Sequence, residues 1–333
     1  MRFTFVVPGS AVFDRDTLAG PALARLASWS SSRSDAPGVE AATLQALGAA
    51  RAADGRSPPV APAAALGAGL EPGPSTVLVA DPVSLVAGRD DVRLAARIDD
   101  LDADEVAAIV VALDAHFAAD GLRFHAPRPD AIFATSATRP SLDTVPLAVA
   151  LGGVLSAHPP RGADARLWLR WGTEIQMLLF THPVNAARER AGRPAVNGLW
   201  FWGGGALDDL GLVAPFRAHA ADSRAGDVVR GLARHAGGET LRLPASFEAA
   251  VHAVPATRPA AHVVVALPPL GEARSLDWAE RDWFAPAAEA LARGRIASIA
   301  LATDRGVWNV PRPGFAARLR ARLAPRRRPA PSA

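Results

Sequence analysis

The stretch Thr173–Gly205, TEIQMLLFTHPVNAARERAGRPAVNGLWFWGGG, gathers tryptophan, asparagine, histidine and glycine at close spacing. Apolar residues at helical spacing predict a helix over residues 174–180. Pro183 ends that helix, because the residue before a proline is pushed away from the helical region. A second helix is expected over residues 184–191, where glycine and proline follow. The stretch is therefore predicted to contain two short helices followed by a strand.

That last strand is predicted to carry two tryptophans into a glycine turn. Trp200 and Trp202 point to one face, since side chains alternate along a strand. Gly203, Gly204 and Gly205 allow positive φ and let another backbone or a ligand approach with no Cβ in the way. We interpret the motif as structural, with both tryptophans in a core or an interface, and keep a ligand site as the alternative.

Four polar side chains are the candidate ligand-binding residues. Asn185, Arg188 and Asn197 belong to the stretch, and Arg305 follows a strand predicted over residues 296–302. Guanidinium groups bind phosphate and carboxylate through charge-assisted hydrogen bonds, and amides offer donors and acceptors. These residues predict a site for an anionic small metabolite, and no catalytic residue follows from them.

Composition excludes several classes of protein. The 333 residues carry 36 basic side chains, all of them arginine, against 33 acidic ones, and a net charge of +3 gives no basis for nucleic-acid binding. The absence of cysteine excludes disulfides, thiolate metal sites and a cysteine nucleophile. No apolar run reaches the ~20 residues that span a bilayer, and the N-terminus lacks a signal-peptide core. We expect a cytoplasmic protein that binds neither membrane nor nucleic acid.

Alternating strands and helices predict an α/β fold with a mainly parallel sheet and helices on both faces. Residues 28–74 are poor in large apolar side chains, and we expect most of them to be loosely ordered. Asp81-Pro82 is expected to end the second strand. The strands are predicted at 3–7, 76–80, 262–267 and 296–302, and the helices at 15–29, 222–236 and 278–292.

A block of different character lies in the middle of the chain. It contains a predicted strand at 92–98, a helix at 103–119 and two strands at 122–125 and 131–135. The acidic residues within 99–105 are interpreted as helix caps rather than metal ligands, because they sit at a helix N-terminus. The block is predicted to be an inserted α+β domain.

The pattern HPVNxxRxxxGxPxVNxLWxWGGG, which begins at His182, resembles a segment of the archaeal type of cofactor-independent phosphoglycerate mutase. It is still more similar to proteobacterial RpfE-type regulatory proteins, which are often also labelled phosphoglycerate mutase. The resemblance implies an alkaline-phosphatase-like core with an inserted domain that covers the active site as a lid. The implied division is a core of 1–90 and 197–320, an insert of 91–196 and a disordered basic tail of 321–333.

The resemblance also implies two divalent metals, held by Asp and His, and a Ser or Thr nucleophile. Where the relatives have an Asp-Gly pair after the first strand, this chain has Pro8-Gly9-Ser10. Residues 267–272, LPPLGE, replace a later Asp and His, and Asp304-Arg305 replaces a final Asp-His pair. Arginine carries no lone pair for a metal. We therefore expect no metal and no cofactor.

Three interpretations stay open. The first is a regulatory relative of phosphoglycerate mutase that has lost the two-metal site and binds an anionic metabolite. The second is an active metal-dependent mutase or phosphatase whose ligands go unrecognised. The third is an interaction protein in which Trp200, Trp202 and Trp283 form a partner surface. Metal content separates the second interpretation from the others, and a pull-down or the oligomeric state tests the third.

Overall fold

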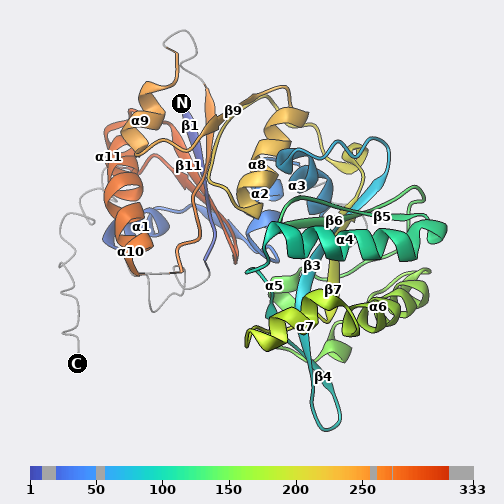
Figure 1. Ribbon diagram of the computed structural model, residues 1–333. Helices are drawn as coiled ribbons and strands as arrows, with labels where there is room; N and C mark the ends of the chain where they lie inside the picture. Colours follow the sequence, from blue (N-terminus) through green and yellow to red (C-terminus); the bar gives the residue numbers. More distant parts are fainter. Residues whose placement is uncertain (10–19, 50–56, 256–260, 272, 315–333) are drawn as a thin grey trace, which may run out of the picture.

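A computed structural model describes residues 1–9, 20–49, 57–255, 261–271 and 273–314, and its strands form two sheets (Figure 1). The first sheet has the strand order β2-β12-β11-β1-β10-β8-β9. Strands β11, β1, β10, β8 and β9 are parallel, whereas β12 is antiparallel to β11 and β2 to β12. Their bounds are β1 Arg2–Val7, β2 Ser32–Ser34, β8 Arg217–Ala220, β9 Glu239–Arg242, β10 His262–Ala266, β11 Ser298–Thr303 and β12 Gly306–Pro311.

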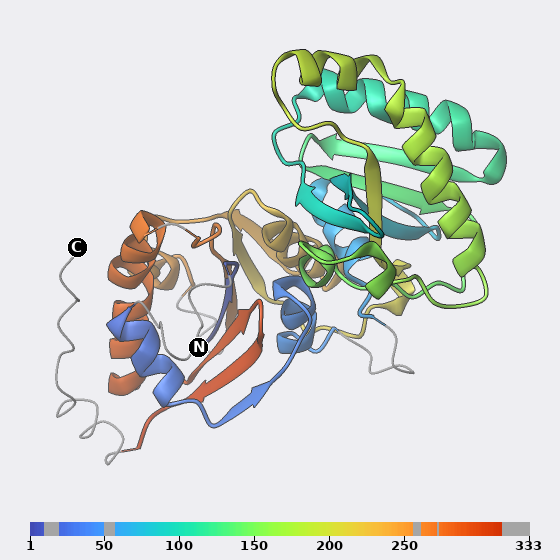
Figure 2. The ribbon, with the colours of Figure 1, turned by 90° about the horizontal axis from the view of Figure 1, so that it is seen from below.

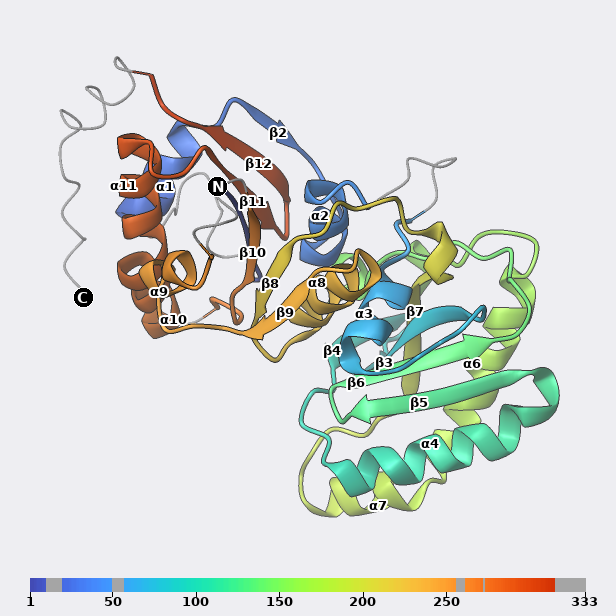
Figure 3. The ribbon, with the colours of Figure 1, turned by 90° about the horizontal axis from the view of Figure 1, so that it is seen from above.

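Helices cover both faces of this sheet, because its central strands are apolar on both sides. Phe3 and Phe5 of β1 face one layer of helices, and Val6 faces the other. Figure 3 shows α1, α9, α10 and α11 on one face and α2 and α8 on the opposite face. The predicted α/β class with a mainly parallel sheet is confirmed. The helices are α1 Pro21–Ser28, α2 Val39–Ala46, α8 Arg224–His235, α9 Phe247–His252, α10 Ala273–Ala279 and α11 Ala285–Arg293, with a π-helical turn at Glu280–Phe284.

The second sheet is antiparallel, with the order β4-β3-β6-β5 and β7 also paired to β3. Helix α3 packs on the face toward the first sheet, and α4, α6 and α7 lie on the outer face (Figures 2 and 3). Its larger elements are α3 Val60–Ala68, β3 Thr76–Ala87, β4 Val92–Arg97, α4 Ala103–Phe117, β5 Leu122–Arg128, β6 Ala131–Ser136, α6 Ala165–Phe180, α7 Pro183–Arg190 and β7 Gly198–Gly205. Shorter helical turns are α5 Leu147–Ala150, η2 Ala118–Asp120, η3 Leu155–Ala157 and η4 Leu207–Asp209.

Strand pairing differs from the expected grouping of residues 1–90 with 197–320. Strands β3 and β7 pair with each other in the second sheet, together with β4, β5 and β6 of the expected insert, and not in the sheet that contains β1. Both strands bury side chains on two faces, because helices pack on both faces of the second sheet. The division into domains, with an insert of 91–196, stays a prediction.

The expectation of loose order over residues 28–74 was wrong for the described part of that range. Helix α3 is buried from Val60 to Leu66, although its side chains are small. It packs closely on α8, and a Cβ added to Gly231 would lie 1.8 Å from the carbonyl oxygen of Ala63. Small residues therefore allow the two backbones to approach. Residues 50–56, the first part of the helix predicted at 15–29 and the tail at 321–333 lie outside the described residues.

Within the described parts of the chain, every helix is too short or too polar to cross a membrane.

Candidate functional site

The carboxyl ends of the parallel strands meet at the edge of the first sheet that faces the second sheet. There the loop after β1 is tied to the loop after β11, because Gly9 N donates to Asp304 Oδ2 at 2.7 Å. Gly38 N, just before α2, donates to Asp304 O at 3.2 Å. Helix α8 also begins at this edge, directly after β8. Open α/β sheets bind ligands at this edge.

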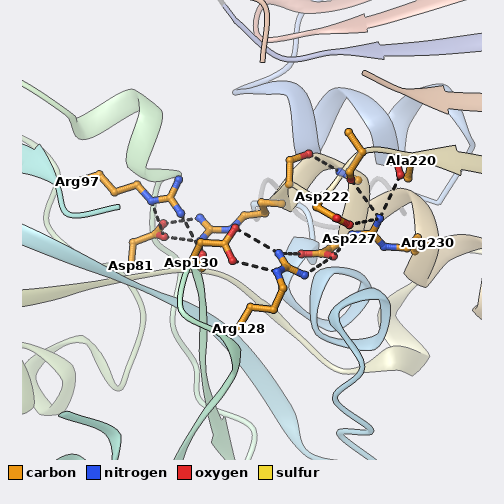
Figure 4. Close-up of polar contacts among 12 residues, drawn as sticks. Asp81, Arg97, Arg128, Asp130, Ala220, Asp222, Asp227 and Arg230 are labelled. Atoms are coloured by element: carbon orange, nitrogen blue, oxygen red, sulfur yellow. Dashed lines mark hydrogen bonds and ion pairs between the residues drawn. The ribbon is translucent and has the colours of Figure 1, made fainter. Parts of the chain in front are cut away.

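Asp81 is the most buried charge of this region, with a side chain that is 0% exposed. Arg224, at the start of α8, donates from Nη1 to Asp81 Oδ2 at 2.7 Å and from Nη2 to Oδ1 at 2.5 Å. Trp202 Nε1 donates to Asp81 Oδ2 at 2.7 Å, and Arg97 Nε lies 3.4 Å from Oδ1. Arg224 also lies over the indole of Trp202, 5.7 Å from the ring centroid. Asp81 thus links both sheets (Figure 4).

A second set of ion pairs lies beside the first (Figure 4). Arg128, at the end of β5, donates to both oxygens of Asp227 on α8, at 3.0 and 2.8 Å. It also donates from Nε to Asp130 Oδ1 at 3.0 Å. Arg230 donates from Nη2 to Asp227 Oδ1 at 2.5 Å. The Asp227 side chain is 1% exposed, so two guanidinium groups neutralise a buried carboxylate here.

Burial and nearby charges shift the pKa values of three carboxyl groups, downward at Asp81 and upward at Glu40 and Asp304. Burial alone raises the pKa of Asp81, but Arg224 and Arg97 outweigh it and hold that pKa below its ordinary value. Burial raises the pKa of Glu40, at the start of α2, although Arg224 opposes it. Burial also raises the pKa of Asp304, against the effect of its hydrogen bond from Gly9. The Asp81 carboxylate is thereby kept ionised, whereas Glu40 and Asp304 hold a proton more readily.

Two of the predicted ligand-binding residues are enclosed near α7. Asn185 donates to Leu179 O and Val196 O and accepts from Val196 N. The Arg188 side chain is 0% exposed and contacts two carboxylates, with 2.6 Å from Nη2 to Asp100 Oδ1 and 3.1 Å from Nη1 to Glu105 Oε2. Both side chains join α7 to neighbouring segments.

The other two predicted residues lie apart from each other. Asn197 Oδ1 accepts from Leu85 N at 2.6 Å, and Asn197 Nδ2 donates to Leu85 O at 2.8 Å. Arg305 lies in the turn between β11 and β12 and is exposed. The structure therefore brings Asn185 and Arg188 together but places Arg305 in the other sheet. Their role in ligand binding stays a prediction.

The tryptophans do not form the partner surface considered above. Trp200 is 9% exposed, Trp202 3% and Trp283 0%, so that interpretation of these three residues was wrong. Gly203 has φ +66°, and a Cβ there would lie 3.1 Å from Val60 Cβ. Glycine at this position lets the start of α3 approach the backbone of β7. The sequence suggested such an approach.

Metal-ligating side chains do not gather in the part of the chain that the structure describes, since no group of three His, Asp or Glu residues could hold an ion there. The carboxylates at the facing edges contact arginine or backbone N–H groups instead. Asp81 was expected in a turn and was not predicted as a site residue, and the expected turn was wrong because β3 continues to Ala87 with Pro82 opposite Leu199. Asp81 and Arg224 are 143 residues apart, and no local signal connects them.

The similarity of this chain to known proteins is found among solved structures. No protein-family model and no curated protein matches the chain. The chain is similar to the PH0037 protein from Pyrococcus horikoshii, with 14% identity, a TM-score of 0.49 and coverage of 93% of this chain and 87% of that one. It is also similar to a cofactor-independent phosphoglycerate mutase from Thermoplasma acidophilum DSM 1728, with 17% identity, a TM-score of 0.42 and coverage of 92% and 89%.

Proposed function

We propose that this chain is a phosphoglycerate-mutase-like protein that has lost the two-metal site and acts as a regulatory or ligand-binding relative. The observation that carries the proposal is the pairing of carboxylates with arginines where the two sheets meet. Asp81 and Asp227 are each neutralised by two guanidinium groups, at side-chain exposures of 0% and 1%. A carboxylate held in this way has its oxygens occupied and fixed. The region then serves recognition and contact rather than phosphoryl transfer.

The proposed ligand is an anionic small metabolite at the carboxyl edge of the first sheet. Asp304 is tied by its hydrogen bond to Gly9, and this fixes the turn that carries Arg305. Arg305 is exposed and follows the last parallel strand, so a phosphate or carboxylate can reach its guanidinium. Asn185, Arg188 and Asn197 lie in the half of the molecule that holds the second sheet and would stabilise that half.

Two measurements test the loss of catalysis. We expect the purified protein to hold no stoichiometric zinc, manganese or magnesium by elemental analysis. We also expect no interconversion of 2- and 3-phosphoglycerate above background when manganese or magnesium is added. Metal-stimulated mutase activity that disappears in Asp304→Asn would instead support an active enzyme with ligands that the sequence analysis did not recognise.

Binding is tested separately, by thermal melts with and without 3-phosphoglycerate. We expect the ligand to raise the melting temperature of the wild type and of Arg166→Gln, an exposed helical control. The shift should be lost in Arg305→Gln. An equal shift in Arg305→Gln and Arg166→Gln would remove Arg305 from the proposal, and no shift in the wild type would contradict anion binding at this site.

A further inference from the structure

A cavity of about 920 Å³ lies in the second sheet's half of the molecule, away from the ion pairs described above. Its walls come from the β3–β4 hairpin, residues 155–160, helix α6 and the start of β7. Trp168, Trp200 and Phe201 line it and are buried, each at most 9% exposed. Small-molecule sites have volumes of roughly 300–1,000 Å³ and mostly apolar linings. The cavity has the size and the aromatic surface of such a site.

Hydrogen bonds hold the walls of this cavity in place. Asn197 fixes both backbone groups of Leu85, at the bulge where the register between β3 and β4 shifts. Leu94 N donates to Gly153 O at 3.1 Å, and Gly152 N donates to Leu94 O at 2.8 Å. The hairpin is therefore bound on one side to β7 and on the other to the segment that precedes residues 155–160. A site that is preformed in this way loses little entropy when a ligand binds.

The charges of the lining restrict the chemistry of the ligand. Apart from His158, its charged residues are all at the hairpin tip, at Arg89, Asp90 and Asp91. Among the described residues that line the cavity, the arginine is at the hairpin tip and not in the aromatic part, so that part offers no guanidinium to an anionic ligand, and burying an unpaired charge is costly. Leu169 lines the cavity and is 53% exposed, so a ligand would cover apolar surface there. We propose that this cavity binds a neutral, mainly apolar small molecule.

One glycine offers a direct way to fill the cavity. Gly172 of α6 lines it, and a Cβ added there meets no atom within 4 Å. A larger residue can therefore project into the open space without displacing its neighbours. Replacing a helical glycine also removes the extra conformational entropy that glycine loses when a helix forms. Gly172→Phe should block the cavity in a folded protein, and Gly172→Ala is the matched control.

Binding is measured by titrating the full chain with 1-decanol and following tryptophan fluorescence, with decanoate as the charged comparison. We expect saturable binding of decanol, tighter than that of decanoate at pH 7. Gly172→Phe should raise the decanol dissociation constant at least tenfold, whereas Gly172→Ala should change it less than twofold. Leu169→Arg, at an exposed position of the rim, is a second blocking variant if Gly172→Phe fails to fold.

Three results would overturn this proposal. The first is the absence of saturable decanol binding to the wild type. The second is equal affinity in the wild type and both blocking variants. The third is a concentration-dependent dimer in sedimentation that Gly172→Phe abolishes, because a second copy of the chain would then occupy the cavity. None of these results bears on anion binding at the carboxyl edge of the first sheet.

Discussion

At the scale of single residues, Asp81 is a fully buried carboxylate that Arg224 contacts at both oxygens. Asp81→Asn keeps the shape of the side chain but removes the charge that faces Arg224, whose side chain is only 10% exposed. Breaking a buried ion pair by removing one partner costs about 3–5 kcal/mol, because the other charge stays buried and unpaired. We expect a loss of that size in the free energy of unfolding, measured by urea denaturation.

The matched control for this substitution is Asp222→Asn. Asp222 has a side chain that is 94% exposed and lies 3.5 Å from Arg230. Exposed ion pairs contribute about 0–1 kcal/mol, so this variant should unfold like the wild type. Equal stability of Asp81→Asn and Asp222→Asn would show that the ion pair between Asp81 and Arg224 does not hold the two sheets together.

The buried side chain of His262 should make the free energy of unfolding depend on pH. Burial and the nearby charge of Arg2 lower the pKa of His262 to about 4, and the ring contacts Thr4 Oγ1 at 2.9 Å. The unfolded chain takes up this proton near pH 6.5, whereas the folded protein does not until about pH 4. The stabilising contribution is therefore complete above pH 6.5 and is lost as the pH falls from 6.5 to 4.

Urea denaturation between pH 7.5 and 4 measures this effect. The free energy of unfolding of His262→Gln should decrease less than that of the wild type over this pH interval. His116→Gln is the control, since His116 is exposed on α4 and contacts only the surface residue Glu174 among the polar partners described. A fall that is equally steep in His262→Gln and the wild type would mean that other groups cause it.

At the scale of helices and strands, the close crossing of α3 and α8 joins the two sheets. Any side chain at Gly231 meets the backbone of α3, because an added Cβ would lie 1.8 Å from Ala63 O. We expect Gly231→Ala to destabilise the protein by about 1–3 kcal/mol, as overpacking does. Gly172→Ala, in the open space beside α6, should be neutral or stabilising. Thermal melts compare the two, and similar melting temperatures would contradict the close packing.

Local patterns predicted most elements near the site. The helices at α4 and α8 and the strands β5, β6, β10 and β11 follow from apolar periodicity and caps, such as Asp102, whose side chain accepts from Glu105 N. Pairing was harder, because the sequence shows that Thr76–Ala80 is an apolar strand but not which sheet it joins. The packing of α3 could not be predicted from its alanine-rich sequence, because small side chains pack tightly only when a partner helix comes as close as α8 does.

At the scale of the whole molecule, Arg128 joins the second sheet to α8 through its hydrogen bonds to Asp227. Arg128→Gln removes both bonds to Asp227, although Arg230 still neutralises that carboxylate. We expect a loss of about 1–3 kcal/mol, since hydrogen bonds to charged groups contribute amounts of that order. Hydrogen exchange should become faster at the β5–β6 turn and in the first turn of α8.

The control for this variant is Arg123→Gln, on the same strand, because Arg123 is exposed. Its exchange should match the wild type in both segments. If Arg128→Gln also matches the wild type, the ion pair between Arg128 and Asp227 does not hold the second sheet against α8.

The order of strands along the chain has a consequence for synthesis on the ribosome. Every strand of the second sheet lies between Thr76 and Gly205, whereas β1 must wait for β10 and β11, which begin at His262 and Ser298. Chains emerge from the ribosome at roughly 5–20 residues per second, and early segments fold first. We therefore expect the second sheet to form while β1 is still unpaired. For several seconds the apolar faces of Phe3 and Phe5 would then be open to chaperones.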